Sequence, residues 1–377
     1  MRRSMILATA AAAAAGLLLA GCSSDNGNDT GTGGTGGTAT ETGGGNGGGK
    51  TPFVGVILPD TKSSVRWETA DRKYLKDAFD AAGVKADIQN AQGDATQFQT
   101  LADQMITEGV NVLMIVNLDS GSGSAVLQKA KQQGIGTIDY DRLTLGGGAD
   151  FYVSFDNTKV GELQGTGLAK CLKDKGKTSG NIVYLDGAPT DNNATLFSAG
   201  AHKILDPMTQ YKKVAEQAVP KWDNQQAGTI FEQMWTQQAG KIDGVLAAND
   251  GLGNAAIAIL QKNKVNGQIP VTGQDATDQG LQNILAGDQC MTVYKAVKKE
   301  ADAASALAIA LAKGGDTSSA NGTVTDTQTK KEVKAVLLDP EAIYFDNVKD
   351  VIADGYTTKD KVCTAALAAK CAEAGIS

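Results

Sequence analysis

Hydrogen-bonding and aromatic side chains recur directly after the apolar runs of this 377-residue chain. The set consists of Arg66, Trp67, Asn117, Asp119, Asp141, Arg142, Asn193, Trp222, Asn249, Asp275 and Lys295. Carboxylates, amides and cations can form paired hydrogen bonds with neighbouring hydroxyl groups, and an indole offers a flat apolar surface to the C–H face of a sugar ring. Each polar residue alone could be a turn residue or a helix cap, as Asn249 could. Their recurrence at equivalent positions favours a ligand site, and its chemistry suits a sugar.

The apolar runs are predicted to be strands that alternate with helices. In the first half we expect strands at 53–58, 84–89, 110–116 and 135–140, and helices at 66–82, 96–108 and 124–133. The second half repeats this rhythm with strands at 151–155, 181–185, 213–219, 242–247 and 269–272, and helices at 160–172, 193–205, 225–238 and 254–262. Continuous apolar strands that alternate with helices are typical of parallel βαβ units.

This pattern predicts an α/β fold with two consecutive doubly wound parallel sheets, each at the centre of one lobe. Ligands of such sheets bind beyond the carboxyl ends of the strands. Because the polar residues follow those ends, we expect two facing lobes to bring them into a shared cleft. A further strand-like run at 291–294 places Lys295 at an equivalent position.

The N-terminus has the features of a secretory signal. Arg2 and Arg3 precede an apolar run at 5–20, which ends in Leu19-Ala20-Gly21-Cys22. The run is shorter than the roughly 20 apolar residues that span a bilayer. The Leu-Ala-Gly-Cys sequence resembles a bacterial lipobox, whose Cys becomes the lipid-bearing first residue; an ordinary signal peptide with a chance Cys is the alternative. We therefore expect a signal peptide at 1–21, lipid on Cys22, and a disordered Gly- and Thr-rich tether over 22–50. The protein would be anchored on the extracytoplasmic face of the cell membrane.

The net charge, the cysteines and the single histidine indicate which partners, disulfides and metals to expect. The net charge of −7 argues against nucleic acid, whose phosphates require basic patches. The four cysteines of the body, Cys171, Cys290, Cys363 and Cys371, are expected to form disulfides in an oxidising compartment. Three pairings are possible, and the short loop between the last two favours them weakly. With a single histidine and no Cys-x-x-Cys pair, no metal is expected, and no cofactor is implied.

Several motifs resemble those of one family of transport proteins. The stretches at 137–143 (TIDYDRL), 152–164 (YVSFDNTKVGELQ), 191–194 (DNNA), 272–276 (TGQDA) and 291–295 (MTVYK) are similar to the D-xylose-binding proteins of ABC importers. The stretches at 61–67 (TKSSVRW) and 249–252 (NDGL) resemble the neighbouring multiple-sugar-binding branch. The similarity covers about 53–355. The Gly146-Gly147-Gly148 insertion and the cysteine-containing C-terminal extension depart from it.

The resemblance implies a two-lobed type I periplasmic-binding fold with three hinge crossings, which we expect near 141–150, 274–278 and 336–340. The N-terminal lobe would comprise 51–141 plus 276–336, and the C-terminal lobe 142–275 plus 337–377. By motif, Trp67 and Trp222 would stack on a pyranose. The remaining nine residues of the set would hydrogen-bond it, although the register around Asn117 can shift by one position.

The implied function is capture of a monosaccharide, D-xylose first, by a monomer that delivers it to an ABC permease. No catalytic residue is expected. Three other functions are considered. The first is a broad glucose- and galactose-binding protein with a chemosensory role. The second is a glycoside hydrolase that uses paired carboxylates, and the third is a transcription regulator of the same fold. The regulator would need an N-terminal DNA-binding motif in place of the signal sequence.

Overall fold

The computed structural model describes residues 51–376. The expected signal peptide, lipid site Cys22 and tether lie outside the described residues. Within the described residues, no helix is both long enough and apolar enough to cross a membrane.

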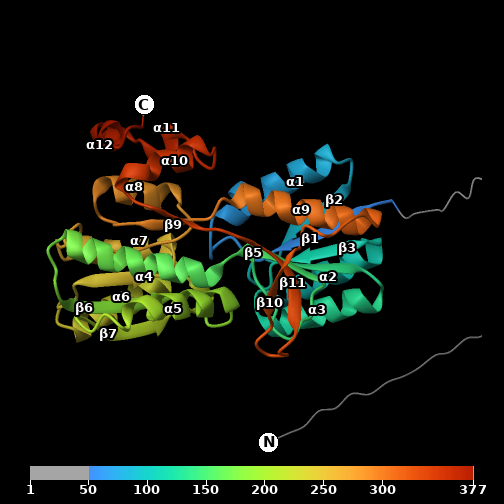
Figure 1. Ribbon diagram of the computed structural model, residues 1–377, viewed down its shortest axis with the longest axis horizontal. Helices are drawn as coiled ribbons and strands as arrows, with labels where there is room; N and C mark the ends of the chain where they lie inside the picture. Colours follow the sequence, from blue (N-terminus) through green and yellow to red (C-terminus); the bar gives the residue numbers. More distant parts are fainter. Residues whose placement is uncertain (1–50, 377) are drawn as a thin grey trace, which may run out of the picture. The chain divides into compact units, whose positions relative to one another are not determined.

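A seven-stranded sheet forms the centre of the first lobe (Figure 1). Its strand order is β10 (Gly322–Thr325), β11 (Glu332–Leu338), β5 (Phe151–Phe155), β4 (Gly136–Tyr140), β3 (Val112–Ile115), β1 (Phe53–Leu58) and β2 (Lys85–Asn90). All neighbours are parallel except β10 and β11. Both faces are covered, which explains why the central strands are continuous apolar runs. Helices α1 (Arg72–Ala81) and α9 (Val297–Lys313) pack on one face, and α2 (Ala95–Glu108) and α3 (Ser120–Gln132) on the other. The π-helical turn η1 (Trp67–Asp71) leads directly into α1.

The second lobe is built on a smaller parallel sheet. Its strand order is β7 (Tyr211–Ala218), β6 (Gly180–Asp186) and β8 (Gly244–Ala247). Helices α4 (Asn157–Asp174) and α5 (Asn192–Leu205) cover one face, and α6 (Asn224–Gln237) and α7 (Asp250–Lys262) the other. The short turn η2 (Pro220–Trp222) lies between β7 and α6.

Residues after α7 complete this lobe. Helix α8 (Asp278–Ala286) contacts α7, and β9 (Thr292–Tyr294) pairs antiparallel with β12 (Glu341–Ile343). The chain then ends in η3 (Phe345–Asn347), α10 (Val348–Ala353), α11 (Lys359–Val362), η4 (Ala365–Leu367) and α12 (Ala368–Glu373).

Two crossings between the lobes lie later in the chain than expected. The strand at 151–155 was expected to open the second sheet, but it pairs with β4 and β11 of the first. The chain therefore leaves the first sheet after Phe155, and it returns to the first lobe between β9 and α9 rather than at 274–278. An apolar strand has the same sequence pattern in either sheet, so periodicity could not assign it. The third crossing lies between Leu338 and Glu341.

The expected strand at 269–272 is reduced to one isolated bridge between Val245 and Val271. Pro270 interrupts this run and has no N–H to donate to a ladder. A parallel bridge between Gln274 and Val293 continues the same edge toward β9.

Two disulfides are formed, as expected for these cysteines. Cys171 of α4 pairs with Cys290, just before β9, and Cys363 pairs with Cys371 near the C-terminus. Of the three possible pairings, the structure has the one that contains the weakly favoured short loop.

Candidate ligand-binding site

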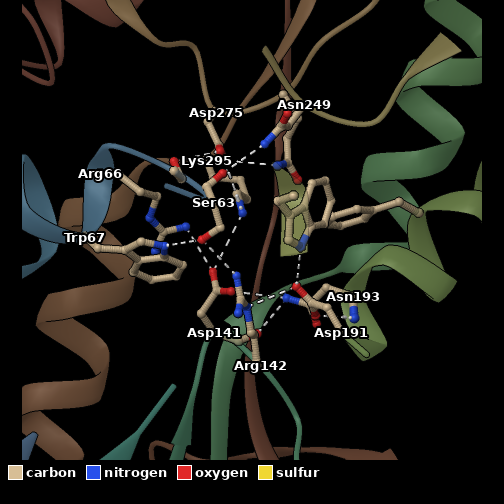
Figure 2. Close-up of a pocket in the computed structure, with 14 residues that line it drawn as sticks. Ser63, Arg66, Trp67, Asp141, Arg142, Asp191, Asn193, Asn249, Asp275 and Lys295 are labelled. Carbon is tan, nitrogen blue, oxygen red and sulfur yellow. Dashed lines mark hydrogen bonds and ion pairs between the residues drawn. The ribbon is translucent and has the colours of Figure 1, made fainter. Parts of the chain in front are cut away.

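A narrow pocket lies between the strand ends of the two lobes (Figure 2). It is lined by Ser63, Ser64, Arg66, Trp67, Asp141, Arg142, Asp191, Asn193, Phe197, Trp222, Asn249, Gln274, Asp275 and Lys295. The enclosed space is only about 20 Å³, far below the range of about 300–1,000 Å³ for small-molecule sites, so a ligand can enter only if the lobes separate. The side chains that line the pocket suit a small ligand with many hydrogen-bonding groups.

Arg66 is fixed by three buried carboxylates. Its Nε and one terminal nitrogen donate to Asp71, and the same terminal nitrogen donates to Glu300 at 2.6 Å. Its other terminal nitrogen donates to Asp141 Oδ2 at 2.9 Å. Burial opposes the charge of Arg66, but these carboxylates outweigh burial and raise its pKa. Arg66 is thus a permanent cation that orients Asp141 toward the pocket.

Lys295 is a second cation close to Asp141. Its Nζ lies 3.7 Å from Asp141 Oδ2 and 3.4 Å from Asp275 Oδ1. Burial would raise the pKa of Asp141, but the cations Lys295, Arg66 and Arg142 lower it below the ordinary value. Asp141 is therefore an ionised acceptor at neutral pH. Such charged groups form the stronger hydrogen bonds with hydroxyls.

Two of these acidic residues have a left-handed backbone. The φ angle is +62° at Asp141 and +91° at Asp275. Residues with a Cβ adopt this region rarely, and such positions cluster at functional sites. The strained backbone is consistent with a site that fixes the direction of both carboxylates.

Trp222 is held by Asp191 on the wall formed by the second lobe. Its indole Nε1 donates to Asp191 Oδ2 at 3.1 Å, and Phe197 packs edge-on against the ring at a centroid distance of 6.4 Å. A Cβ at Gly187 would lie only 2.0 Å from the indole, so the ring requires glycine there. Asp191 also accepts from the N–H of Asn193 and caps α5. The ring is therefore fixed by packing and by a hydrogen bond.

Trp67 supplies an indole from the first lobe. Its Nε1 donates to Ser63 Oγ at 3.0 Å, and the guanidinium of Arg66 lies 4.5 Å from the ring centroid. Trp67 and Trp222 are 3% and 4% exposed, so both are almost entirely enclosed. The pocket thus has one aromatic side chain from each lobe.

Hydrogen bonds join the two lobes around the pocket. Asn193 Nδ2 donates to the Asp141 carbonyl at 2.9 Å, and Asn249 Nδ2 donates to the Ser63 carbonyl at 3.1 Å. Arg142 Nε lies 3.0 Å from Asp191 Oδ2. The residues that line the pocket therefore also connect the lobes.

Two buried polar atoms at the pocket have no hydrogen-bond partner among residues 51–376. They are Arg142 Nε, whose ion pair with Asp191 lacks hydrogen-bond geometry, and Gln274 Oε1. An unpaired buried donor or acceptor costs about 1–3 kcal/mol. A donor and an acceptor of this kind match the hydroxyl groups of a polar ligand.

The structure brings nine of the eleven predicted site residues together around this pocket; Asn117 is not among its lining residues, and Asp119 lines a neighbouring cavity with Arg142 and Trp222. The amide of Asn117 donates to the Arg142 carbonyl at 3.0 Å and to Thr144 Oγ1 at 2.9 Å, which supports the loop behind the pocket. The carboxylate of Asp119 accepts from the N–H and hydroxyl of Ser122, both at 2.8 Å, and so caps α3. Both side chains are thus used by local structure.

Five pocket residues were not among the predicted set: Ser63, Ser64, Asp191, Phe197 and Gln274. Asp191 and Gln274 follow strand ends, and their position there was the available signal. Phe197 lies four residues after Asn193 on α5, so helical spacing places both on one face. The two serines had no signal beyond their proximity to Arg66 and Trp67.

No cluster suited to a metal occurs in the described part of the chain, where no group of three or more His, Cys, Asp or Glu residues could hold an ion.

Comparison with known proteins identifies the family. Residues 54–316, more than half of the chain, match the family described as "Periplasmic binding protein domain". The chain belongs to the periplasmic binding protein family. It is 36% identical over 313 residues to the D-xylose-binding periplasmic protein of Haemophilus influenzae, covering 82% of this chain and 91% of the relative. It is 34% identical over 326 residues to the multiple sugar-binding periplasmic protein SbpA of Azospirillum brasilense, covering 82% and 90%.

A solved structure supports the same grouping. A carbohydrate transporter solute-binding protein from Chloroflexus aurantiacus, in complex with D-glucose, matches with a TM-score of 0.74 and 28% identity, covering 82% of this chain and 97% of that one. The predicted α/β fold of the periplasmic-binding type is confirmed by these matches. These relatives are named for binding or transport, which supports a binding protein rather than an enzyme.

Proposed function

We propose that this protein captures a monosaccharide in the pocket between its lobes and delivers it to an ABC permease, with D-xylose as the first candidate. The observation that carries the proposal is the composition of the pocket. One buried indole from each lobe lines the pocket together with a set of ionised and amide side chains. The names of the D-xylose-binding relatives support the choice of sugar.

In the proposed binding mode, aromatic and polar side chains contact different parts of the sugar. Trp67 and Trp222 stack on the apolar faces of the ring. The hydroxyls and the ring oxygen pair with the polar set, Arg66, Asp141, Arg142, Asn193, Asn249, Asp275 and Lys295. Arg66 acts largely through Asp141, because most of its donors are already used by carboxylates.

Closure of the lobes is the proposed mechanical step. A sugar that contacts residues of both lobes binds the closed arrangement better than an open one, and so shifts the population toward closure. We further propose that the protein acts as a monomer held to the extracytoplasmic membrane face by lipid on Cys22. The Leu-Ala-Gly-Cys sequence supports this anchor.

A broader specificity for aldoses such as glucose or galactose, with a chemosensory role, is the second candidate. The resemblance to a multiple sugar-binding relative and to a D-glucose complex favours it. A hydrolase would need a carboxylic acid that is protonated at neutral pH next to an ionised partner. Asp141 cannot be this acid, since its cationic neighbours lower its pKa. Burial raises the pKa of Asp191, but both of its carboxylate oxygens already accept hydrogen bonds, from the Asn193 N–H and from the Trp222 indole.

Isothermal titration with a panel of pentoses and hexoses tests the proposal. We expect D-xylose to bind most tightly, and Asp275→Ala to weaken that binding at least about tenfold, because it leaves Lys295 without one of its partners. Product analysis after prolonged incubation should recover the sugar unchanged. Normal binding by Asp275→Ala, or recovery of a modified sugar, would contradict the proposal.

A further inference from the structure

The C-terminal segment, residues 345–376, packs behind two of the segments that form the pocket. Its elements α11, η4 and α12 contact α8, and the red helices lie beside α8 in Figure 1. The disulfide between Cys363 and Cys371 joins the end of α11 to α12. The segment is therefore a cross-linked unit rather than a loose tail.

An apolar layer connects this segment to the pocket residues. Val348, Val351, Val362, Cys371 and Ile376 share one buried cluster with residues on the other side of the interface, Ala276, Tyr294 and Ala296. Ala276 directly follows Asp275, and Tyr294 and Ala296 directly flank Lys295. Successive residues of these two strips thus point alternately toward the pocket and toward the C-terminal segment.

Polar contacts fasten the same interface. The hydroxyl of Tyr294 donates to Asp354 Oδ2 at 2.5 Å, and the ring of Tyr356 packs on Tyr294 at a centroid distance of 5.4 Å. Gln282 Nε2 of α8 donates to the Lys361 carbonyl at 2.8 Å. Thr357 Oγ1 also donates to Asp278, the first residue of α8.

The two pocket strips are bonded to each other, so they move together. The N–H of Asp275 donates to the Val293 carbonyl at 2.9 Å, and the N–H of Ala276 donates to Thr292 Oγ1 at 3.3 Å. On the pocket side, Lys295 Nζ lies 3.4 Å from Asp275 Oδ1. A displacement of β9 would therefore change the positions of both charged groups.

We infer that the C-terminal segment is a positioning element for the binding site, and that Tyr294 is the positioning residue through which it sets Lys295 and Asp275. This inference rests on the proposed sugar-binding function. Binding groups must be held within about 0.5 Å of their productive geometry by a supporting layer of packed and hydrogen-bonded residues. Tyr294, Asp354 and the disulfide-linked helices α11 and α12 supply that layer on one side of the pocket.

Isothermal titration of Tyr294→Phe with D-xylose is the test, with Tyr211→Phe as the matched control. The control removes a tyrosine hydroxyl that donates to the Lys177 carbonyl at 3.0 Å, in the same lobe but outside the pocket. We expect Tyr294→Phe to raise Kd by about threefold to tenfold, the scale of one lost hydrogen bond. The double variant Cys363→Ala/Cys371→Ala should act in the same direction. Tyr211→Phe should keep the Kd of the wild type.

A second comparison separates positioning from general loosening of the fold. In a Lys295→Gln background, titrated at millimolar sugar, Tyr294→Phe should change Kd by a smaller factor than in the wild type, because one of the two groups that it positions is gone. An equal factor in both backgrounds would overturn the inference. So would a Kd within twofold of the wild type for both Tyr294→Phe and the cysteine variant. If the wild type binds none of the sugars, the proposed function fails and this inference fails with it.

Discussion

Asp141 is the residue at which the charge networks of the site meet. Arg66 reaches it from the first lobe and Lys295 from the hinge, while Asn193 of the second lobe donates to its carbonyl. Its backbone φ of +62° aims the carboxylate into this position. Asp141 thus contacts residues of both lobes and of the hinge. Its full set of contacts forms only when both lobes are in place.

Trp222 provides a direct test of the aromatic contacts. Replacement by Ala removes a buried indole that lines the pocket, and we expect sugar binding to weaken by about 1–3 kcal/mol. Titration calorimetry measures the change. Trp235→Phe on α6 is the control and should bind as the wild type does, because Trp235 does not line the pocket. Unchanged affinity in both Trp67→Ala and Trp222→Ala would remove stacking from the account.

The positions of most pocket residues could be predicted because parallel strands share one binding edge. Arg142, Asn249 and Asp275 follow strand ends, and all three line the pocket. The same rule also predicted that Asn117 and Asp119 would line the pocket. The direction of a side chain at a strand end decides its role, however, and the rule does not give that direction. Asp119 caps a helix instead, and sequence position alone does not distinguish a cap from a ligand contact.

At the scale of elements, periodicity located the strands and helices up to α7 and also strand β9, but it missed helix α8 and did not give the sheet partners of the strands. Strand β5 is as apolar as its neighbours in sequence and nevertheless pairs in the first sheet. The run at 269–272 was predicted to be a strand, but Pro270 interrupts it and only one isolated bridge forms. Long-range pairing depends on packing between distant segments, and this information is not local in the sequence.

Helix α5 and strand β7 are joined by His202, the one histidine of the chain. Its Nδ1 lies 2.8 Å from Asp206 Oδ1, and its Nε2 lies 2.9 Å from Glu216 Oε1. Tyr184 of β6 stacks on the ring, and Lys213 pairs with Glu216. Burial would lower the pKa of His202, but the hydrogen bonds to both carboxylates outweigh burial and raise it.

This contact predicts that the folded state loses stability as the pH rises. A histidine whose pKa is higher in the folded state stabilises the fold fully below its unfolded pKa of about 6.5, and this contribution disappears above its folded pKa. Asp186, whose pKa burial and Glu216 raise to about 7, contributes in the same direction. Thermal melts at pH 6 and pH 9 should show a decrease of about 1–2 °C that His202→Gln reduces. An identical pH dependence in the variant would exclude His202 as its source.

At the scale of the whole molecule, both lobes contribute side chains to the pocket. Neither lobe contains the site by itself, since Trp67 and Asp141 come from one lobe and Trp222 and Asn249 from the other. Hydrogen bonds such as that from Asn249 to Ser63 close the pocket from both sides. The pocket is therefore complete only when the lobes are together, which supports the proposed capture by closure.

The membrane anchor is a separate prediction for the complete chain. Cys22→Ser removes the thiol that would carry lipid, so the variant should lose fatty-acid labelling and appear as unprocessed or soluble protein. Metabolic labelling with a fatty-acid probe, followed by fractionation, measures this. Equal labelling of the variant and the wild type would show that Cys22 is not the site.

A crystal structure of the protein with D-xylose is the most direct test of sugar capture between the lobes. We expect one intact pyranose between Trp67 and Trp222, with its hydroxyls within hydrogen-bond distance of Asp141, Asn249 and Asp275. Density for the sugar outside this pocket, or a sugar in contact with only one lobe, would show that this pocket does not capture the sugar between the lobes.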